Sequence, residues 1–410
     1  LHDAAANKAR LVEGLYRIGV GAVTPATGEP VAYVIPAQQV TASDGSPLAL
    51  AVQRNASDAL VSALIRGGVD VRRALLPFVA GGRAFPAGSL IVDFDQPYGG
   101  FARILLEKQD YPDIRAYQGG PPVQPYDVTA HTLALLMGVD AVRIDTAISG
   151  VVTAPVLAPV DEPPAIGSGR LKWRRVGLYR GATAPIDEGW TRWVFDRWHV
   201  GSIRLDEAQV RAGKLRDRFD VIVLPDMDAA DIAVGRLAGT APPAMTGGLG
   251  KEGAAALVEF VEQGGTLVAL NRSTGYAIRA LDLPVTDALS GMPQNQFYCP
   301  GSILNMEIAA PGSPITRGVP ARTIAWFEDG PGFEVREGAQ NVAVLARFAP
   351  ADRLLGSGWL LGSDKLAGRP AILEIGKGKG TVVLFGFRPQ YRGQSLATLP
   401  LFLNALIESP

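Results

Sequence analysis

The sequence predicts an α/β protein whose second half forms a doubly wound parallel sheet. From residue 175 onward, short β-rich runs alternate with helical segments, and the connections between them are short. Hydrophobic residues make up 47% of the 410-residue chain and glycine occurs 48 times, a composition typical of globular α/β proteins with many turns. Repeated strand and helix units with short connections form parallel sheets with right-handed crossovers.

A first α/β region is expected over residues 1–148. Leu11, Leu15 and Ile18 recur at helical spacing and lead to an apolar run that Pro36 ends. We expect helices at 7–20, 55–66, 98–107 and 128–137, strands at 31–35 and 69–75, and a hairpin within 78–94.

A linker is expected over residues 149–170, because four prolines fall there among few periodic apolar positions. The second domain, residues 171–410, then begins with the regular alternation. We expect strands at 175–179, 202–205, 219–224 and 266–270, and helices at 187–198, 206–216, 251–263 and 274–281. Strands at 323–327 and 342–347, a hairpin at 371–387 and an amphipathic helix at 395–407 complete the same domain.

The charge balance argues against a nucleic acid or an anionic membrane as partner. Thirty-nine basic and forty acidic residues leave a net charge of -1. The longest apolar runs fall well short of the roughly 20 residues that span a bilayer, so we expect no membrane partner. Cys299 is the single cysteine and cannot form an intramolecular disulfide. Because the chain begins with Leu1 and not Met, we expect a processed product or a fragment of a longer protein.

Metal-ligand spacing is missing from the sequence. His2, His131 and His199 are the only histidines, and none has a glutamate three residues later. A catalytic zinc needs about three protein ligands, so no zinc or other cofactor is expected in this chain. Asp226, Asp228 and Asp231 could offer oxygen ligands, but their spacing matches no calcium loop, and solvated turn acids are the favoured interpretation.

One turn is similar to a nucleophile elbow. The expected strand at 266–270 runs directly into Asn271, Ser273 and Gly275, with Ser273 near the tip. Asn271 replaces the first glycine of that motif, and no histidine can be placed beside Ser273 from sequence. Ser273 is therefore a weak candidate nucleophile, and a simple polar turn is favoured.

Two glycine-rich runs predict different local structures. Gly247, Gly248 and Gly250 open an expected helix, where backbone N–H groups can hold an anion, and they are our anion-binding candidates. They do not form a phosphate loop, because Met245 and Glu252 stand at its glycine and hydroxyl positions. The run at 376–380 lies between two β-rich segments and predicts a hairpin turn.

Aromatic residues mark one helix. Trp190, Trp193, Val194 and Trp198 have the spacing of one buried face, and core packing is favoured over a sugar- or peptide-stacking platform. Cys299 lies outside any elbow and is expected to be a buried, small apolar residue.

Nine segments resemble one bacterial family, and the likeness covers nearly the whole chain. The segments are 33–37 (YVIPA), 85–88 (FPAG), 125–131 (PYDVTAH), 135–139 (LLMGV), 187–193 (DEGWTRW), 219–225 (FDVIVLP), 264–268 (GGTLV), 298–302 (YCPGS) and 384–390 (LFGFRPQ). Together they resemble the large carboxypeptidase A-like zinc metallopeptidases, in the portion after the peptidase domain.

The resemblance implies a flavodoxin-like domain similar to class I glutamine amidotransferases, following a zinc exopeptidase domain. None of the family's zinc ligands matches a residue here, so zinc is expected only in the peptidase domain of the parent chain. Active glutaminases place a cysteine at the elbow, where this chain is expected to hold Ser273. The resemblance also implies export, so a periplasmic or extracellular protein is expected.

Two functions follow from these observations. The first is a non-catalytic accessory region of a zinc carboxypeptidase-like protein, with the upstream peptidase domain and possible peptide substrates as its partners. The alternative is an independent hydrolase that uses Ser273. Fold alone does not decide between them.

Overall fold

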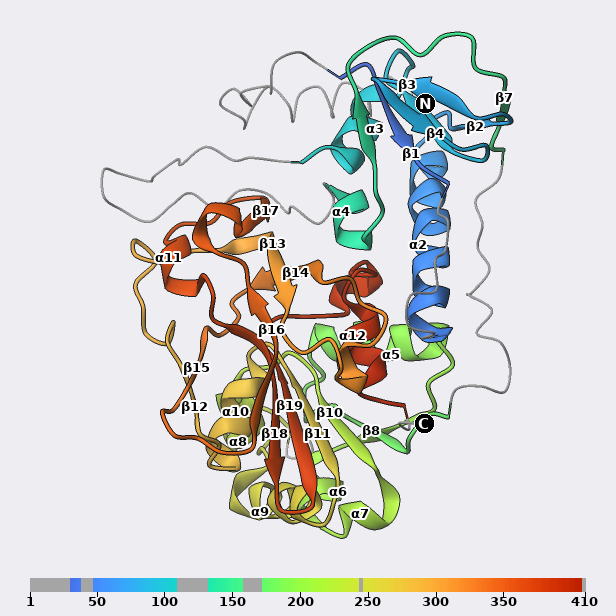
Figure 1. The fold of residues 1–410 in the computed structure, drawn as a ribbon. Coiled ribbons are helices and arrows are strands. Elements are labelled where there is room, and N and C mark those ends of the chain that lie inside the picture. The colour runs from blue at the N-terminus through green and yellow to red at the C-terminus, as the bar shows by residue number, and fades with distance from the viewer. Residues whose placement is uncertain (1–29, 38–46, 109–131, 158–171, 243–245, 408–410) are drawn as a thin grey trace.

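The structure is a computed structural model that describes residues 30–37, 47–108, 132–157, 172–242 and 246–407. It contains a small unit and a large unit (Figure 1). The helix expected at 7–20 lies outside the described residues.

The small unit is built on a five-stranded antiparallel sheet with the order β6-β1-β5-β2-β7. Its strands are β1 (Ala32–Ile35), β2 (Arg72–Ala74), β5 (Leu90–Asp93), β6 (Val142–Ile144) and β7 (Thr153–Pro155), with a hairpin of β3 (Phe78–Ala80) and β4 (Arg83–Phe85). Its helices are α2 (Pro47–Arg66), α3 (Gly99–Leu106) and α4 (Leu133–Met137). Gly68 ends α2 in the left-handed conformation (φ 84°), and its N–H donates to the Ile65 carbonyl at 2.9 Å.

The large unit contains a ten-stranded mixed sheet with the order β14-β13-β16-β18-β19-β11-β10-β8-β9, with β17 beside β13. Its parallel strands are β8 (Val176–Tyr179), β9 (Ser202–Leu205), β10 (Val221–Leu224), β11 (Thr266–Leu270) and β19 (Gly380–Phe385). Numbered along the chain, these five strands have the order 2-1-3-4-5, the arrangement of flavodoxin-like folds. The expected parallel sheet is therefore only part of a larger mixed sheet.

Antiparallel strands extend this sheet on one side. They are β13 (Pro300–Ile308), β14 (Arg322–Glu328), β16 (Val342–Phe348), β17 (Leu355–Ser357) and β18 (Pro370–Lys377), while β12 (Val285–Asp287) pairs separately with β15 (Phe333–Val335). The hairpin predicted at 376–380 is confirmed, since Lys377 pairs with Gly380. Strand β13 was not predicted, because Pro300, Gly301, Asn305 and Glu307 interrupt its apolar residues.

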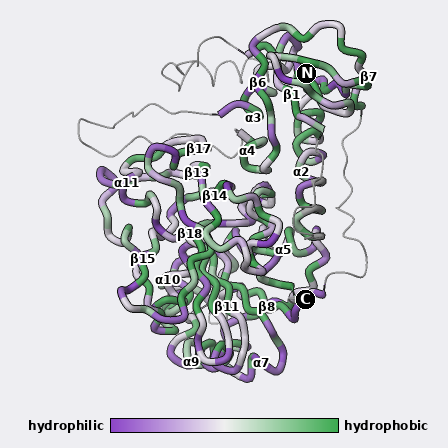
Figure 2. The backbone as a smooth tube through the Cα atoms, viewed as in Figure 1, coloured by the Kyte–Doolittle hydropathy of each residue, from purple (hydrophilic) through white to green (hydrophobic). Residues whose placement is uncertain are grey.

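Helices cover both faces of the parallel strands, which explains why every residue of β10 and β11 is buried. They are α5 (Ile186–Arg197), α6 (Glu207–Arg211), α7 (Leu215–Arg218), α8 (Ala229–Ala233), α9 (Gly250–Glu262), α10 (Ser273–Ala280) and α12 (Leu399–Asn404), whereas α11 (Ser363–Leu366) packs against the short helical turn Ala351–Arg353. Alternate residues of β11 join different cores: Val268 packs in the core that holds α5 and α12, and Leu267 in the core that holds α9. Figure 2 shows hydrophobic residues concentrated along the strands around β8 and β11.

The two units share one hydrophobic core. Helix α2 runs from the small sheet to α12 (Figure 1), and Leu48 and Phe402 belong to the same buried cluster. The hydroxyls of Thr132 and Ser357 lie 2.8 Å apart across the boundary. Part of the expected linker is ordered as well, because residues 153–155 form β7 beside β2. Residues 158–170 lie outside the described residues.

The C-terminal helix differs from its prediction. All six residues of α12 are buried, although the segment was expected to be amphipathic. The reason is its position: α12 packs against α2 on one side, and on another Phe402 stacks on Phe195 of α5 at 5.7 Å.

Candidate functional site

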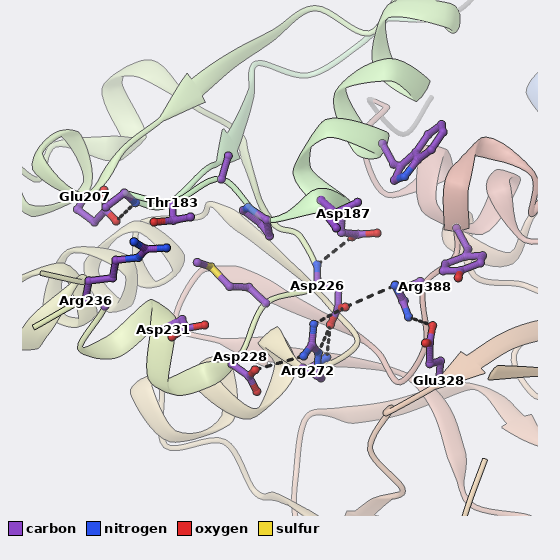
Figure 3. A pocket seen from close by; sticks show the side chains of 18 of the residues that line it. Thr183, Asp187, Glu207, Asp226, Asp228, Asp231, Arg236, Arg272, Glu328 and Arg388 are labelled. Atoms are coloured by element: carbon purple, nitrogen blue, oxygen red, sulfur yellow. Dashed lines mark hydrogen bonds and ion pairs between the residues drawn. The ribbon is translucent and has the colours of Figure 1, made fainter. Parts of the chain in front are cut away.

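A cavity of about 570 Å³ opens at the carboxyl ends of the parallel strands. Its walls come from the segments after β8, β9, β10, β11 and β19, and the last of these contributes Arg388 (Figure 3) and Tyr391. Strands β8 and β10 are neighbours at the point where the strand order reverses, and ligands of doubly wound sheets bind at that point.

Asp226 organises the cavity floor (Figure 3). Its carboxylate is 2% exposed and accepts hydrogen bonds from Nε and Nη2 of Arg272, each at 2.9 Å. The Asn271 side-chain amide donates to the same carboxylate at 3.1 Å. Arg272 also contacts Asp228 at 3.2 Å, so two acids neutralise this one guanidinium group.

Arg388 forms the second charged contact of the floor. It donates to Glu328, its Nη1 lies 3.8 Å from Asp226, and its guanidinium lies 4.5 Å from the ring centroid of Tyr391. Tyr391 in turn stacks on Trp326 at 4.5 Å. Packing of aromatic rings therefore holds Arg388 in place.

Asp187 is a buried carboxylate in the first turn of α5. Its Oδ2 accepts hydrogen bonds from the Asp226 backbone N–H and from the Gln390 side-chain amide, both at 2.9 Å. Burial, and secondly the negative charge of Asp226, raise the pKa of Asp187 to about 6. A buried carboxyl with a raised pKa in a cleft at a switch point is typical of a functional site.

Glu207 forms the opposite wall and is 8% exposed. Its carboxylate accepts from the Ala182 backbone N–H and lies 3.5 Å from the Tyr179 hydroxyl. Burial, together with the charge of Glu207, raises the pKa of Tyr179, which keeps that hydroxyl protonated.

The elbow after β11 holds a different residue at its tip from the one expected. Asn271 is the residue in the left-handed conformation (φ 52°), a region that asparagine tolerates better than most residues. Its amide donates to Asp226 and to the Glu328 carbonyl. Ser273 is fully buried two residues later, inside the first turn of α10.

The Ser273 hydroxyl forms its hydrogen bonds with backbone groups. It lies 2.8 Å from the Leu270 carbonyl and 3.0 Å from the Leu224 carbonyl, and it accepts from the Leu270 N–H at 2.9 Å. No base contacts it among the residues described. This geometry gives Ser273 a structural role, joining the ends of β10 and β11.

Of the three glycines that were candidates for anion binding, one lines the cavity and two do not. Gly247 lines the cavity, but its N–H donates to the Arg236 carbonyl at 2.8 Å and is not available to an anion. The Gly248 carbonyl accepts from Arg211, and Gly250 begins α9 at φ 59°. Neither Gly248 nor Gly250 lines the cavity.

The remaining candidates are placed as follows. Within the described ranges, no group of three or more His, Cys, Asp or Glu side chains could hold a metal ion. Asp231 is exposed, whereas Asp226 is a buried ion-pair partner and not the solvated acid expected. His199 lies two residues after the end of α5, and His2 and His131 lie outside the described residues. Cys299 is buried as predicted, and burial raises its pKa to about 12.

The aromatic helix is only partly a core element. Val194 and Trp198 are 1% exposed, but Trp193 is 44% exposed and Trp190 lines the cavity. The expected single buried face is therefore wrong for Trp190 and Trp193. In the part of the chain that the structure covers, no helix is long and apolar enough to cross a membrane.

Comparisons with known proteins assign this chain to no family. No family model matches the chain, and no curated protein matches it. Among solved structures, a ThuA-like protein from Bacteroides uniformis has 13% identity, covers 56% of this chain and 90% of its own, and has a TM-score of 0.35. A cytoplasmic protein from Salmonella typhimurium has 13% identity, covers 58% and 100%, and has a TM-score of 0.38.

A β-galactosidase from Bacillus circulans sp. alkalophilus has 11% identity, covers 60% of this chain and 33% of its own, and has a TM-score of 0.35. Likenesses at these TM-scores support no argument about activity. The fold and the cavity define a mixed α/β protein with a large mixed sheet. The carboxypeptidase parent expected from the resemblance stays a proposal.

Proposed function

We propose that this chain is a non-catalytic, ligand-binding accessory region of a zinc carboxypeptidase-like protein. In this proposal the large unit has an amidotransferase-like shape without glutaminase chemistry. Zinc and the peptidase residues belong to the peptidase domain of the same parent, which is exported and acts on peptides.

The observation that supports a non-catalytic role is that the Ser273 hydroxyl at the elbow after β11 already hydrogen-bonds to backbone groups. A serine hydroxyl is a weak nucleophile until a neighbouring base takes its proton. Ser273 is buried and bonded to backbone groups of Leu224 and Leu270, and Asn271 at the tip carries no nucleophile. An elbow built in this way positions strands and charged side chains, not a reacting group.

The cavity supports a binding role. About 570 Å³ lies within the range of small-molecule sites, roughly 300–1,000 Å³. Its polar groups are held by hydrogen bonds among four separate segments, after β8, β10, β11 and β19, so the site is preformed. We therefore expect ligand binding without turnover.

The test of the non-catalytic role is direct. Glutaminase, esterase and carboxypeptidase assays on the purified chain should all give background rates, and Ser273→Ala should leave those rates unchanged. Turnover that Ser273→Ala abolishes, with circular dichroism unchanged, would replace this proposal by the hydrolase alternative.

The accessory role needs a second experiment. The parent protein should lose carboxypeptidase stability or substrate affinity when residues 1–410 are deleted, while its zinc content stays the same. Equal KM, kcat and thermal inactivation with and without the region would contradict the accessory role.

A further inference from the structure

We infer that the cavity at the β8–β10 switch point binds an organic cation, a primary amine attached to an apolar body, with Asp187 as its counter-ion and Trp190 as its aromatic wall. This inference concerns the cavity itself and goes beyond the proposed function, since it holds whether or not a peptidase domain precedes the chain.

Asp187 is a buried carboxylate that forms no ion pair within the part of the chain that the structure describes. Its side chain is 5% exposed, and both donors to its Oδ2 are neutral: a backbone N–H and the Gln390 amide. No described Lys, Arg or His forms an ion pair with it. A buried carboxylate is stable in its charged form only when it is paired, so the cavity beside Asp187 favours a ligand with a positive charge.

The arginines of the cavity floor cannot supply that charge. Arg272 is held by both Asp226 and Asp228, and Arg388 is held by Glu328 with Asp226 at 3.8 Å. Each forms its ion pairs with acids other than Asp187, although the charge of Arg388 lowers the pKa of Asp187 at longer range. Moving either one would leave the buried Asp226 or the half-buried Glu328 with less of its countercharge.

The charge of the cavity lining also favours a cation. Six carboxylates and four guanidinium groups line it, so an anion would meet a surplus of negative charge. Ligands that carry only a phosphate or a carboxylate are therefore disfavoured.

Trp190 provides the apolar contact. It follows Asp187 by three residues in α5 and therefore lies on the same face of the helix. The Tyr391 ring already has guanidinium groups of Arg388 and Arg392 over it, at 4.5 and 5.1 Å. In contrast, no described cation lies over the Trp190 ring. An ammonium group on an apolar body can pair with Asp187 and place its apolar part or its charge against this ring.

The test uses benzylamine, which is protonated at pH 7.5, and benzyl alcohol as its uncharged counterpart. Titration calorimetry on the full chain should show saturable binding of benzylamine at least about tenfold tighter than that of benzyl alcohol. Nα-acetyl-lysine amide, tested in the same way, separates the two sources of an amine: binding indicates a lysine side chain, and binding of benzylamine alone indicates a free small amine.

Two variants locate the site. Asp187→Asn keeps an oxygen that can accept from the Asp226 N–H and from Gln390, and should weaken benzylamine binding about tenfold or more. Trp190→Leu should weaken it about threefold while leaving Asp187 in place, and it tests the site if Asp187→Asn fails to fold. The matched control is Asp196→Asn, which removes a charge from an exposed position of the same helix and should change binding less than twofold.

Three results would overturn the inference. They are absence of saturable benzylamine binding, equal binding of benzylamine and benzyl alcohol, and unchanged benzylamine binding by the folded Asp187→Asn and Trp190→Leu variants.

Discussion

Replacing Asp226 by asparagine is expected to lower the free energy of unfolding by about 3 kcal/mol. The carboxylate is 2% exposed and accepts two hydrogen bonds at 2.9 Å from the Arg272 guanidinium. It also accepts from the Asn271 amide at 3.1 Å and lies 3.8 Å from Arg388. An asparagine fills the same space but carries no charge, and it places an N–H donor where one of these donors now points.

The magnitude follows from burial on the two sides of the contact. Breaking a fully buried ion pair by removing one partner costs about 3–5 kcal/mol, because the other charge is left unpaired. Here the Arg272 side chain is 38% exposed, so water and Asp228 recover part of that loss. A range of about 2–4 kcal/mol results.

Urea denaturation followed by tryptophan fluorescence measures this change. All six tryptophans lie in the large unit, which contains the network. The matched control is Asp228→Asn, which contacts the same arginine at 3.2 Å but is 62% exposed, and which should change stability by about 0–1 kcal/mol. If Asp226→Asn were no more destabilising than Asp228→Asn, the central role of Asp226 in this network would be refuted.

Three further predictions concern other parts of the molecule. Burial and the charge of Asp226 raise the pKa of Asp187 from 3.8 to about 6, and the charge of Arg388 opposes this rise. The folded state therefore binds this proton more tightly than the unfolded state does. As a result, the contribution of Asp187 to stability falls as pH rises between about 4 and 6. Asp187→Asn should therefore gain stability relative to the wild type by roughly 2–3 kcal/mol between pH 4 and pH 7, and a constant difference in urea denaturation would contradict this. Ser273→Ala should lower the free energy of unfolding by about 1–3 kcal/mol in the same assay, because it leaves buried backbone groups without partners; no loss would argue against its structural role. Leu48→Ala in α2 should lower the free energy of unfolding by about 2–5 kcal/mol and shift the urea midpoint seen by tryptophan fluorescence, although no tryptophan lies in the small unit. A shift of the midpoint seen by circular dichroism alone would show that the two units unfold separately.

The sequence predicts the parallel strands of the large unit well, because burial on both faces makes them continuous apolar runs, as in Val221–Leu224 and Thr266–Leu270. It does not predict β13, whose polar and proline positions are accommodated by pairing with β14 and β16. Pairing across the sheet is a tertiary effect that local pattern does not contain.

The site is harder to predict than the fold, because its residues come together only in space. Asp187 and Gln390 are separated by 203 positions yet hydrogen-bond at 2.9 Å. The elbow was located correctly, but which of its residues adopts the left-handed conformation was not. Asn271 takes that position because asparagine tolerates positive φ, whereas Ser273 already has helical geometry in α10.

The position of β19 in the sheet has a consequence for synthesis on the ribosome. β19 is the neighbour of β11, yet β11 ends at Leu270 and β19 begins at Gly380. At usual translation rates, β11 waits on the order of 10 s with one backbone edge unpaired. Such an apolar edge is a surface to which other nascent chains or chaperones can bind. A chain that stops before residue 380 is therefore expected to be retained by chaperones or to aggregate, and release should require the final hairpin.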